Sequence, residues 1–316
     1  MTVIIPKEEY LKIVASAVRF ANARIPEDDW LEVSGVIIGR NEGEDVIVSA
    51  VYPIMHQELD KDAVIDQYKW KDEDYEALYI IDDDAFSRGD FTVGWYHSHP
   101  GFKVMMSHID IRTTLSYQIN NPMAISLVFN PLRLVKQIEL PDKKGNPDIP
   151  LHNDPGFKIF RLTDVNKGIQ ASYHPVDFRV EGFDSPEQLV QLTQGFIVDI
   201  TNLLPKDGVV ESYQSLVNKS VEELNAQLIG TEEYLKTLAM KGETSRIPEV
   251  LQNQSRDIKI SAERINKKIE KMKRFLDYLE YKERATIVPA ALEILKIWEE
   301  KVANLDSALQ TISQKF

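Results

Sequence analysis

The stretch from Gly94 to Asp110 limits the possible folds of this chain most strongly, because it sets a strand and a helix in a fixed order. Phe91-Thr92-Val93 predicts a β-strand that continues to the two histidines. Side chains on a strand alternate between its faces, so His97 and His99 point to the same side. Ser107 is a typical N-cap residue and predicts a helix over 107–120, on which Asp110 lies one turn further along.

Two imidazoles and one carboxylate form a ligand set that leaves a fourth position open, which is typical of catalytic zinc. The chain has no cysteine, which excludes thiol ligands, thiol nucleophiles and disulfides. Each half of the pattern also has a simpler interpretation. A His-x-His pair is often half-exposed, and Ser-x-x-Asp is a common helix start. The combination favours a hydrolytic zinc site with His97, His99 and Asp110 as ligands.

The whole run Gly-Trp-Tyr-His-Ser-His-Pro-Gly-Phe over 94–102, followed by Ser107 and Asp110, resembles the JAMM (MPN-plus) zinc metallopeptidases. It is similar to the deubiquitinating subunits of the proteasome lid and the deneddylating subunits of the signalosome. The resemblance implies an α/β (α+β) fold, an MPN domain with a central mixed sheet flanked by helices, and Zn²⁺ as the cofactor.

The resemblance also assigns two catalytic residues. Glu32 stands at the head of a β-branched apolar run, 33–39, where the family has its general base. A carboxylate there can take a proton from the attacking water and pass it to the leaving amine. Ser107 corresponds to the family serine that stabilises the oxyanion. The simpler alternatives are a solvent-facing glutamate at a strand edge and a serine that only caps a helix.

The implied reaction is removal of ubiquitin or a ubiquitin-like modifier from lysine. The acidic region 58–66 has the right sign to meet an Arg-bearing modifier tail. The chain has Lys-Val-Met-Met over 103–106 where these relatives have Gly-Cys-Trp-Leu, which leaves the modifier and linkage open. Two alternatives also stay open: a non-catalytic MPN scaffold or dimerisation subunit, and a processing protease for a small ubiquitin-like or sulfur-carrier protein.

Hydrophobic periodicity predicts further elements. Helices are expected over 7–24 and 72–88, the second with an apolar side formed by Tyr75, Leu78, Tyr79 and Phe86 and an acidic opposite side. Strands are expected over 45–51, 123–129 and 157–162. The segments 56–71 and 136–155 are irregular and take the place of the two insertions of the family.

From Ser185 onward the pattern changes to apolar seams spaced by three and four residues, which predicts packed helices. We therefore expect a catalytic domain over 1–180 and a helical assembly domain over 185–316, joined by a linker that includes Pro175 and 182–186. This arm would bind a proteasome subunit, another MPN protein or a second copy of the chain.

The remaining features of the sequence limit which partners and which cellular compartment are expected. It shows no signal peptide and no membrane-spanning run. Its net charge of -13 argues against binding to nucleic acid. These features predict a cytoplasmic protein with no membrane partner.

Overall fold

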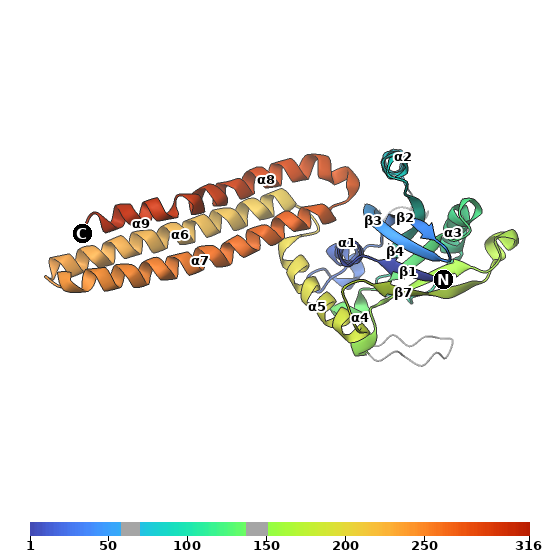
Figure 1. Ribbon diagram of the computed structural model, residues 1–316, viewed down its shortest axis with the longest axis horizontal. Coiled ribbons are helices and arrows are strands. Elements are labelled where there is room, and N and C mark those ends of the chain that lie inside the picture. Colours follow the sequence, from blue (N-terminus) through green and yellow to red (C-terminus); the bar gives the residue numbers. More distant parts are fainter. Residues whose placement is uncertain (58–69, 137–150) are drawn as a thin grey trace. The chain divides into compact units, whose positions relative to one another are not determined.

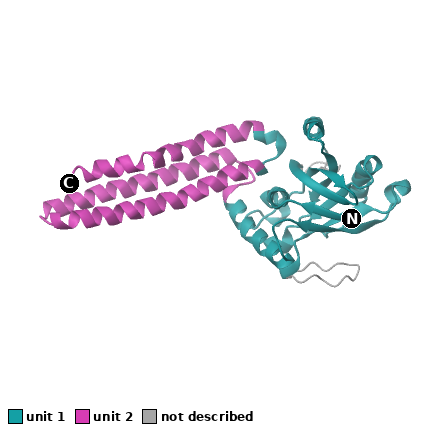
Figure 2. Ribbon diagram, in the orientation of Figure 1, with its two compact units in different colours: residues 1–202, 278–284 teal, residues 203–277, 285–316 magenta. Residues whose placement is uncertain are grey.

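The computed structural model describes residues 1–57, 70–136 and 151–316. The chain forms two compact units (Figure 2). Unit 1 contains residues 1–202 and 278–284, and unit 2 contains residues 203–277 and 285–316. The predicted insertions, 56–71 and 136–155, and the acidic region 58–66 lie largely or wholly outside the described residues. The predicted separation into independent domains stays a prediction.

Unit 1 is built on a mixed sheet in the order β1-β3-β2-β4-β5-β6-β7. β1 pairs in parallel with both β3 and β7, so the sheet closes on itself. The predicted combination of a mixed sheet and helices is confirmed, whereas the closure was not predicted. The strands are β1 (Thr2–Ile5), β2 (Val33–Glu42), β3 (Asp45–His56), β4 (Phe91–Ser98), β5 (Ile125–Phe129), β6 (Phe157–Leu162) and β7 (Tyr173–Val180).

The hairpin of β2 and β3 is longer than the sequence pattern predicted, and it turns at Gly43, whose φ is 62°. Gly35 in β2 allows the close approach of a neighbouring strand. A Cβ at this position would lie 2.4 Å from the Tyr96 ring and 2.3 Å from the Tyr52 carbonyl oxygen. β7 contains Pro175, which pairs with Phe160 of β6. Pro175 therefore lies in the sheet and not in a linker.

Several helices accompany the sheet in Figure 1: α1 (Lys7–Phe20), α2 (Asp72–Ser87), α3 (His108–Asn120), α4 (Leu132–Val135) and α5 (Pro186–Leu203). α1 is almost wholly buried from Tyr10 onward. It is joined to α5 by a hydrogen bond between the hydroxyls of Tyr10 and Thr193, and to β4 by one between those of Ser16 and Tyr96. α1 therefore lies between α5 and the sheet and is bonded to both.

The α2 helix forms where it was predicted, but its buried side was predicted wrongly. Tyr75, Tyr79 and Phe86 are 59%, 74% and 79% exposed. The buried residues are instead Asp74, Ala77, Ile81 and Ala85. Ile81 and Ala85 pack in a core cluster with residues of β2 and β3, and Leu78 is partly buried against it, whereas the three aromatic side chains lie on the outside.

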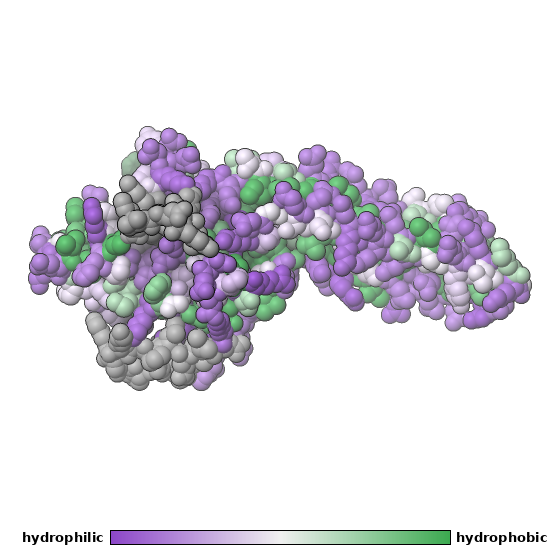
Figure 3. Space-filling model, turned by 180° about the vertical axis from the view of Figure 1, so that it is seen from behind, coloured by the Kyte–Doolittle hydropathy of each residue, from purple (hydrophilic) through white to green (hydrophobic). Residues whose placement is uncertain are grey.

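Unit 2 is a bundle of long helices that run side by side (Figure 1). Its members are α6 (Val209–Met240), α7 (Ile247–Phe275), most of α8 (Tyr281–Ala303) and α9 (Leu305–Ser313). The predicted seams face one another inside it, with Leu224, Leu235, Ile258, Leu295 and Trp298 buried. On the face drawn in Figure 3 its surface is mainly hydrophilic, with scattered hydrophobic residues. Among the described residues no helix is long and apolar enough to cross a membrane.

Candidate metal centre

The end of β4 and the first turn of α3 bring together His97, His99 and Asp110. The Nε2 atoms of the two histidines are 3.0 Å apart. His97 Nε2 lies 3.2 Å from Asp110 Oδ1, and His99 Nε2 lies 3.5 Å from Asp110 Oδ2. All three residues are buried. They are the residues named as ligands from the sequence, and within the described ranges they form the one group of this kind that could hold a metal ion.

Packing between β4 and α3 fixes the distance between these residues. Trp95 stacks on the ring of His97 with the ring centroids 4.3 Å apart, and its Nε1 donates a hydrogen bond to Thr114 Oγ1 on α3. The side chain of Trp95 therefore touches both a histidine and the helix that bears Asp110. Because Trp95 and Thr114 are themselves buried, the spacing of the three residues is set by core packing.

Two of the three side chains, His97 and Asp110, have the protonation that a bound cation needs. Burial lowers the pKa of His97 and favours the neutral imidazole. Burial also opposes protonation of His99, but the hydrogen bond to Asp110, the Lys103 carbonyl and the nearby charges raise its pKa. Burial by itself would raise the pKa of Asp110, yet its contacts with both histidines hold that pKa well below the usual range. The carboxylate is therefore ionised.

The tautomer of His99 is set by a backbone contact. His99 Nδ1 lies 2.9 Å from the carbonyl oxygen of Lys103, an atom that can only accept. Nδ1 therefore carries the hydrogen, and the lone pair of a neutral Nε2 faces His97 and Asp110. Since this contact uses only the backbone of Lys103, the unusual side chains over 103–106 do not disturb it.

These donors fit a metal ion. Two imidazole nitrogens and a carboxylate oxygen converge within 4.8 Å of one another. A neutral His99 and an ionised Asp110 would otherwise bring lone pairs face to face, so the cluster needs a cation or a shared proton between them. Such a set of nitrogen and oxygen donors suits zinc, and the absence of cysteine leaves no thiolate site.

Ser107 is the N-cap of α3, as predicted. Its Oγ accepts a hydrogen bond from the Asp110 amide at 3.2 Å, and its own amide donates to Asp110 Oδ2 at 2.6 Å. This reciprocal pair anchors the Asp110 carboxylate. Because Ser107 is exposed and its oxygen is the acceptor in the cap, the hydroxyl hydrogen can point to a bound molecule.

Glu32 lies just before β2 and is brought to the cluster by strand pairing. Ser34 of β2 is opposite His97 of β4. The amide of Val33 donates to Ser98 Oγ at 3.0 Å, and the Glu32 carbonyl accepts from the Gln57 amide at 2.7 Å. The Glu32 charge contributes to the raised pKa of His99. The backbone at Glu32 is therefore held from two sides, close to the proposed ligands.

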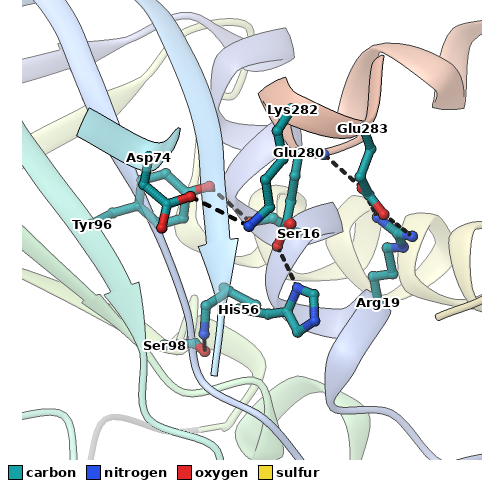
Figure 4. Close-up of polar contacts among 10 residues, drawn as sticks. Ser16, Arg19, His56, Asp74, Tyr96, Ser98, Glu280, Lys282 and Glu283 are labelled. Atoms are coloured by element: carbon teal, nitrogen blue, oxygen red, sulfur yellow. Dashed lines mark hydrogen bonds and ion pairs between the residues drawn. The ribbon is translucent and has the colours of Figure 1, made fainter. Parts of the chain in front are cut away.

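Two contacts around this site were missed in the sequence. Ser98, between the two histidines, has a hydroxyl that joins β4 to β2 beside Glu32. His56, at the end of β3, contacts Glu280 (Figure 4). The position of Ser98 inside the His-Ser-His motif was a signal for the first contact. Nothing in the sequence indicated the second, whose partners are 224 positions apart.

Comparison with known proteins gives consistent matches over the N-terminal part of the chain. Residues 1–123 match the family described as JAB1/Mov34/MPN/PAD-1 ubiquitin protease. The 26S proteasome non-ATPase regulatory subunit 14 of Caenorhabditis elegans is 30% identical over 156 residues, covering 48% of this chain and 50% of that protein. The 26S proteasome regulatory subunit rpn11 of Schizosaccharomyces pombe is 27% identical over 172 residues, covering 53% and 55%.

A third relative is the COP9 signalosome complex subunit 5 of Debaryomyces hansenii, which is 24% identical over 210 residues, covering 60% of this chain and 43% of that protein. The chain spans about half the length of the curated relatives it matches. The matched residues 1–123 include Glu32, both histidines of β4, Ser107 and Asp110. These findings confirm that the N-terminal part of the chain resembles the JAMM (MPN) family.

Proposed function

We propose that this chain is a zinc-dependent isopeptidase that removes ubiquitin or a ubiquitin-like modifier from lysine. The observation that supports this most directly is the buried cluster of His97, His99 and Asp110, with the charge of Glu32 close enough to affect His99. The similarity to a ubiquitin protease family and to proteasome and signalosome subunits supports the substrate class.

In this proposal His97, His99 and Asp110 hold the zinc ion. When bound, zinc would act as a Lewis acid and lower the pKa of a coordinated water. The Glu32 carboxylate takes a proton from the attacking water and gives it to the leaving lysine amine. The Ser107 hydroxyl donates a hydrogen bond to the oxygen of the scissile carbonyl as negative charge develops there.

The surface next to the cluster supports binding of a polypeptide. Phe102, Met105 and Ile109 are 64%, 45% and 51% exposed, and the ring of Phe102 lies edge-on to that of His99 with their centroids 6.3 Å apart. Exposed apolar side chains beside buried polar groups are typical of a binding surface. We propose that they contact the modifier tail near the scissile bond.

The helices of unit 2 supply the proposed assembly function. Their seams already pack against one another, so a partner would meet the outer surface of the bundle, which includes exposed Ile229, Tyr234, Ile260 and Ile297. Because the relatives are named as subunits of the proteasome and the signalosome, we propose a proteasome subunit or another MPN protein as the partner.

The test is incubation of the purified full chain with lysine conjugates of ubiquitin and of ubiquitin-like modifiers of defined linkage. We expect cleavage of at least one conjugate, loss of cleavage with a chelator and recovery when zinc is restored. His108→Ala is a matched control, since His108 is exposed on α3 and outside the cluster. Cleavage that survives the chelator, or no cleavage of any conjugate, would refute the proposal.

A further inference from the structure

The segment Tyr278–Arg284 belongs to unit 1, although helices of unit 2 precede and follow it in the chain. It makes one hydrogen bond and two ion pairs with the rest of unit 1, on three different elements (Figure 4). Glu280 Oε1 lies 2.8 Å from His56 Nδ1 at the end of β3. Glu283 binds Arg19 of α1 through both oxygens, at 2.6 and 3.0 Å. Lys282 Nζ lies 3.3 Å from Asp74 of α2.

In each of these three contacts at least one of the two residues is buried. Glu280, Arg19 and Asp74 are each no more than 2% exposed, and Leu279 beside them is fully buried. Removing the partner of a buried charge is strongly unfavourable, because the remaining charge is left without compensation. Glu280 Oε2 already has no hydrogen-bond partner among the described residues, so the carboxylate depends on His56. The segment is therefore docked specifically.

Glu280 contacts the end of β3, and the residue that follows β3 is hydrogen-bonded to the backbone of Glu32. His56 is the last residue of β3 and pairs with Val33 of β2. The next residue, Gln57, donates its amide hydrogen to the carbonyl oxygen of Glu32 at 2.7 Å. The ring of His56 stacks on Phe20, with the centroids 4.2 Å apart. A carboxylate can only accept, so His56 Nδ1 donates to Glu280. The chain of contacts runs from Glu280 through His56 and Gln57 to the backbone of Glu32.

We propose that His56 and Glu280 are positioning residues for Glu32. Through them, a turn between two long helices of the C-terminal half fixes the backbone next to the metal centre. The proposal rests on the role of Glu32 in the proposed function. Loss of the His56–Glu280 pair frees the end of β3, and Glu32 then samples positions from which proton transfer is inefficient. The metal ligands, on β4 and α3, stay in place.

The test compares three full-length variants. His56→Phe keeps a ring against Phe20 but has no donor for Glu280. His56→Gln keeps a donor and serves as the conservative rescue. Lys282→Gln is the matched control, because it removes an ion pair of the same segment that does not touch β3. For each we measure amide hydrogen exchange at Gln57 and Val33, zinc content, and kcat and KM for a cleaved conjugate.

We expect His56→Phe to raise the exchange rate at Gln57 and to lower kcat by about 10-fold or more, with KM and zinc content unchanged. His56→Gln and Lys282→Gln should remain close to the wild type in all four measurements. If His56→Phe does not fold, Glu280→Leu provides the same comparison, because its side chain has a similar size and no acceptor for His56 Nδ1.

Unchanged exchange at Gln57 in His56→Phe would overturn the proposal, and so would an equal rise in Lys282→Gln. Hydrogen exchange needs no substrate, so it tests the contact even if the chain cleaves no conjugate. In that case the proposed function fails, but the exchange rate still shows whether His56 protects the Gln57 amide. A rise in exchange with unchanged kcat would also refute the positioning role, because the strand end would then move without affecting the reaction.

Discussion

The interiors of the two units differ in how many polar side chains they bury. In unit 1 the interior contains ionisable or polar side chains such as His97, Ser98, Asp110, Thr114 and Asn130. In unit 2 the interior of the described helices is almost entirely apolar, and its buried Thr231 bonds to a carbonyl of its own helix. Burying polar groups costs stability unless their hydrogen bonds are made. In unit 1 the buried polar groups lie mainly at and around the proposed site. In unit 2 the buried side chains contribute to stability alone.

The origin of the contacts also differs. In unit 2 each seam is formed by residues three and four positions apart, repeated along the helices. In unit 1 the proposed site combines local spacing, from His97 to Asp110, with strand pairing that brings in Glu32. We therefore expect mutations of the site residues in unit 1 to affect the reaction or the metal with little effect on stability. Mutations in the core of unit 2 should lower stability with little effect on the metal.

The largest effect is expected for Glu32→Gln. The amide has nearly the same shape but cannot accept the proton of the attacking water, so turnover should be almost abolished. Glu32 is not a proposed ligand, and zinc content should remain that of the wild type. The measurement is conjugate cleavage together with metal analysis on one preparation. Loss of zinc in this variant would make Glu32 a ligand instead.

Ser107→Ala should lower turnover by roughly 10² to 10³, the effect of removing one oxyanion donor. Zinc should be retained, because the Ser107 amide still donates to Asp110 Oδ2. Since the variant also loses the N-cap of α3, Ser107→Gly, which keeps most of the stability of such a cap, controls for helix stability. Full turnover in both variants would leave Ser107 as a cap alone.

In unit 2, Trp298→Ala should reduce the free energy of unfolding by about 3 to 5 kcal/mol, the usual cost of truncating a buried aromatic residue. Trp298 is fully buried and donates a hydrogen bond to Asn266 of α7 at 2.7 Å. Denaturant unfolding and metal analysis test this together. A loss of zinc per chain would break the contrast between the two units.

The smallest effect is expected at the surface of the bundle. Lys296 and Glu300 are both more than 60% exposed and their charged atoms are 3.7 Å apart. Such surface pairs contribute little to stability. Lys296→Gln should leave the unfolding midpoint and the zinc content unchanged within error. A clear shift of the midpoint would show that this surface takes part in packing.

Much of the proposed site could be predicted because its residues are close in sequence. His97 and His99 share a strand face, and Ser107 with Asp110 forms a helix start, so spacing alone placed them. The position of Glu32 followed from family resemblance. The contacts that hold it, from Ser98 and Gln57, depend on the pairing register of three strands, which local patterns do not specify.

The errors have physical causes as well. The aromatic residues of α2 suggested a buried side, but the helix buries the side that carries Ala77, Ile81 and Ala85, and those aromatics remain exposed. Pro175 suggested a linker, yet it sits opposite Phe160 in the sheet. The closing of the sheet pairs β1 with β7, which are the first and last strands in the sequence. None of these outcomes follows from periodicity, because each depends on contacts between distant segments.

If His97, His99 and Asp110 hold a catalytic zinc ion, the zinc content of the chain must depend on them. The wild type, His97→Ala and the control His108→Ala should be purified alike and dialysed against metal-free buffer before metal analysis. We predict one zinc per chain in the wild type and in His108→Ala, and none in His97→Ala. Equal zinc content in the wild type and His97→Ala would mean that His97 is not a zinc ligand.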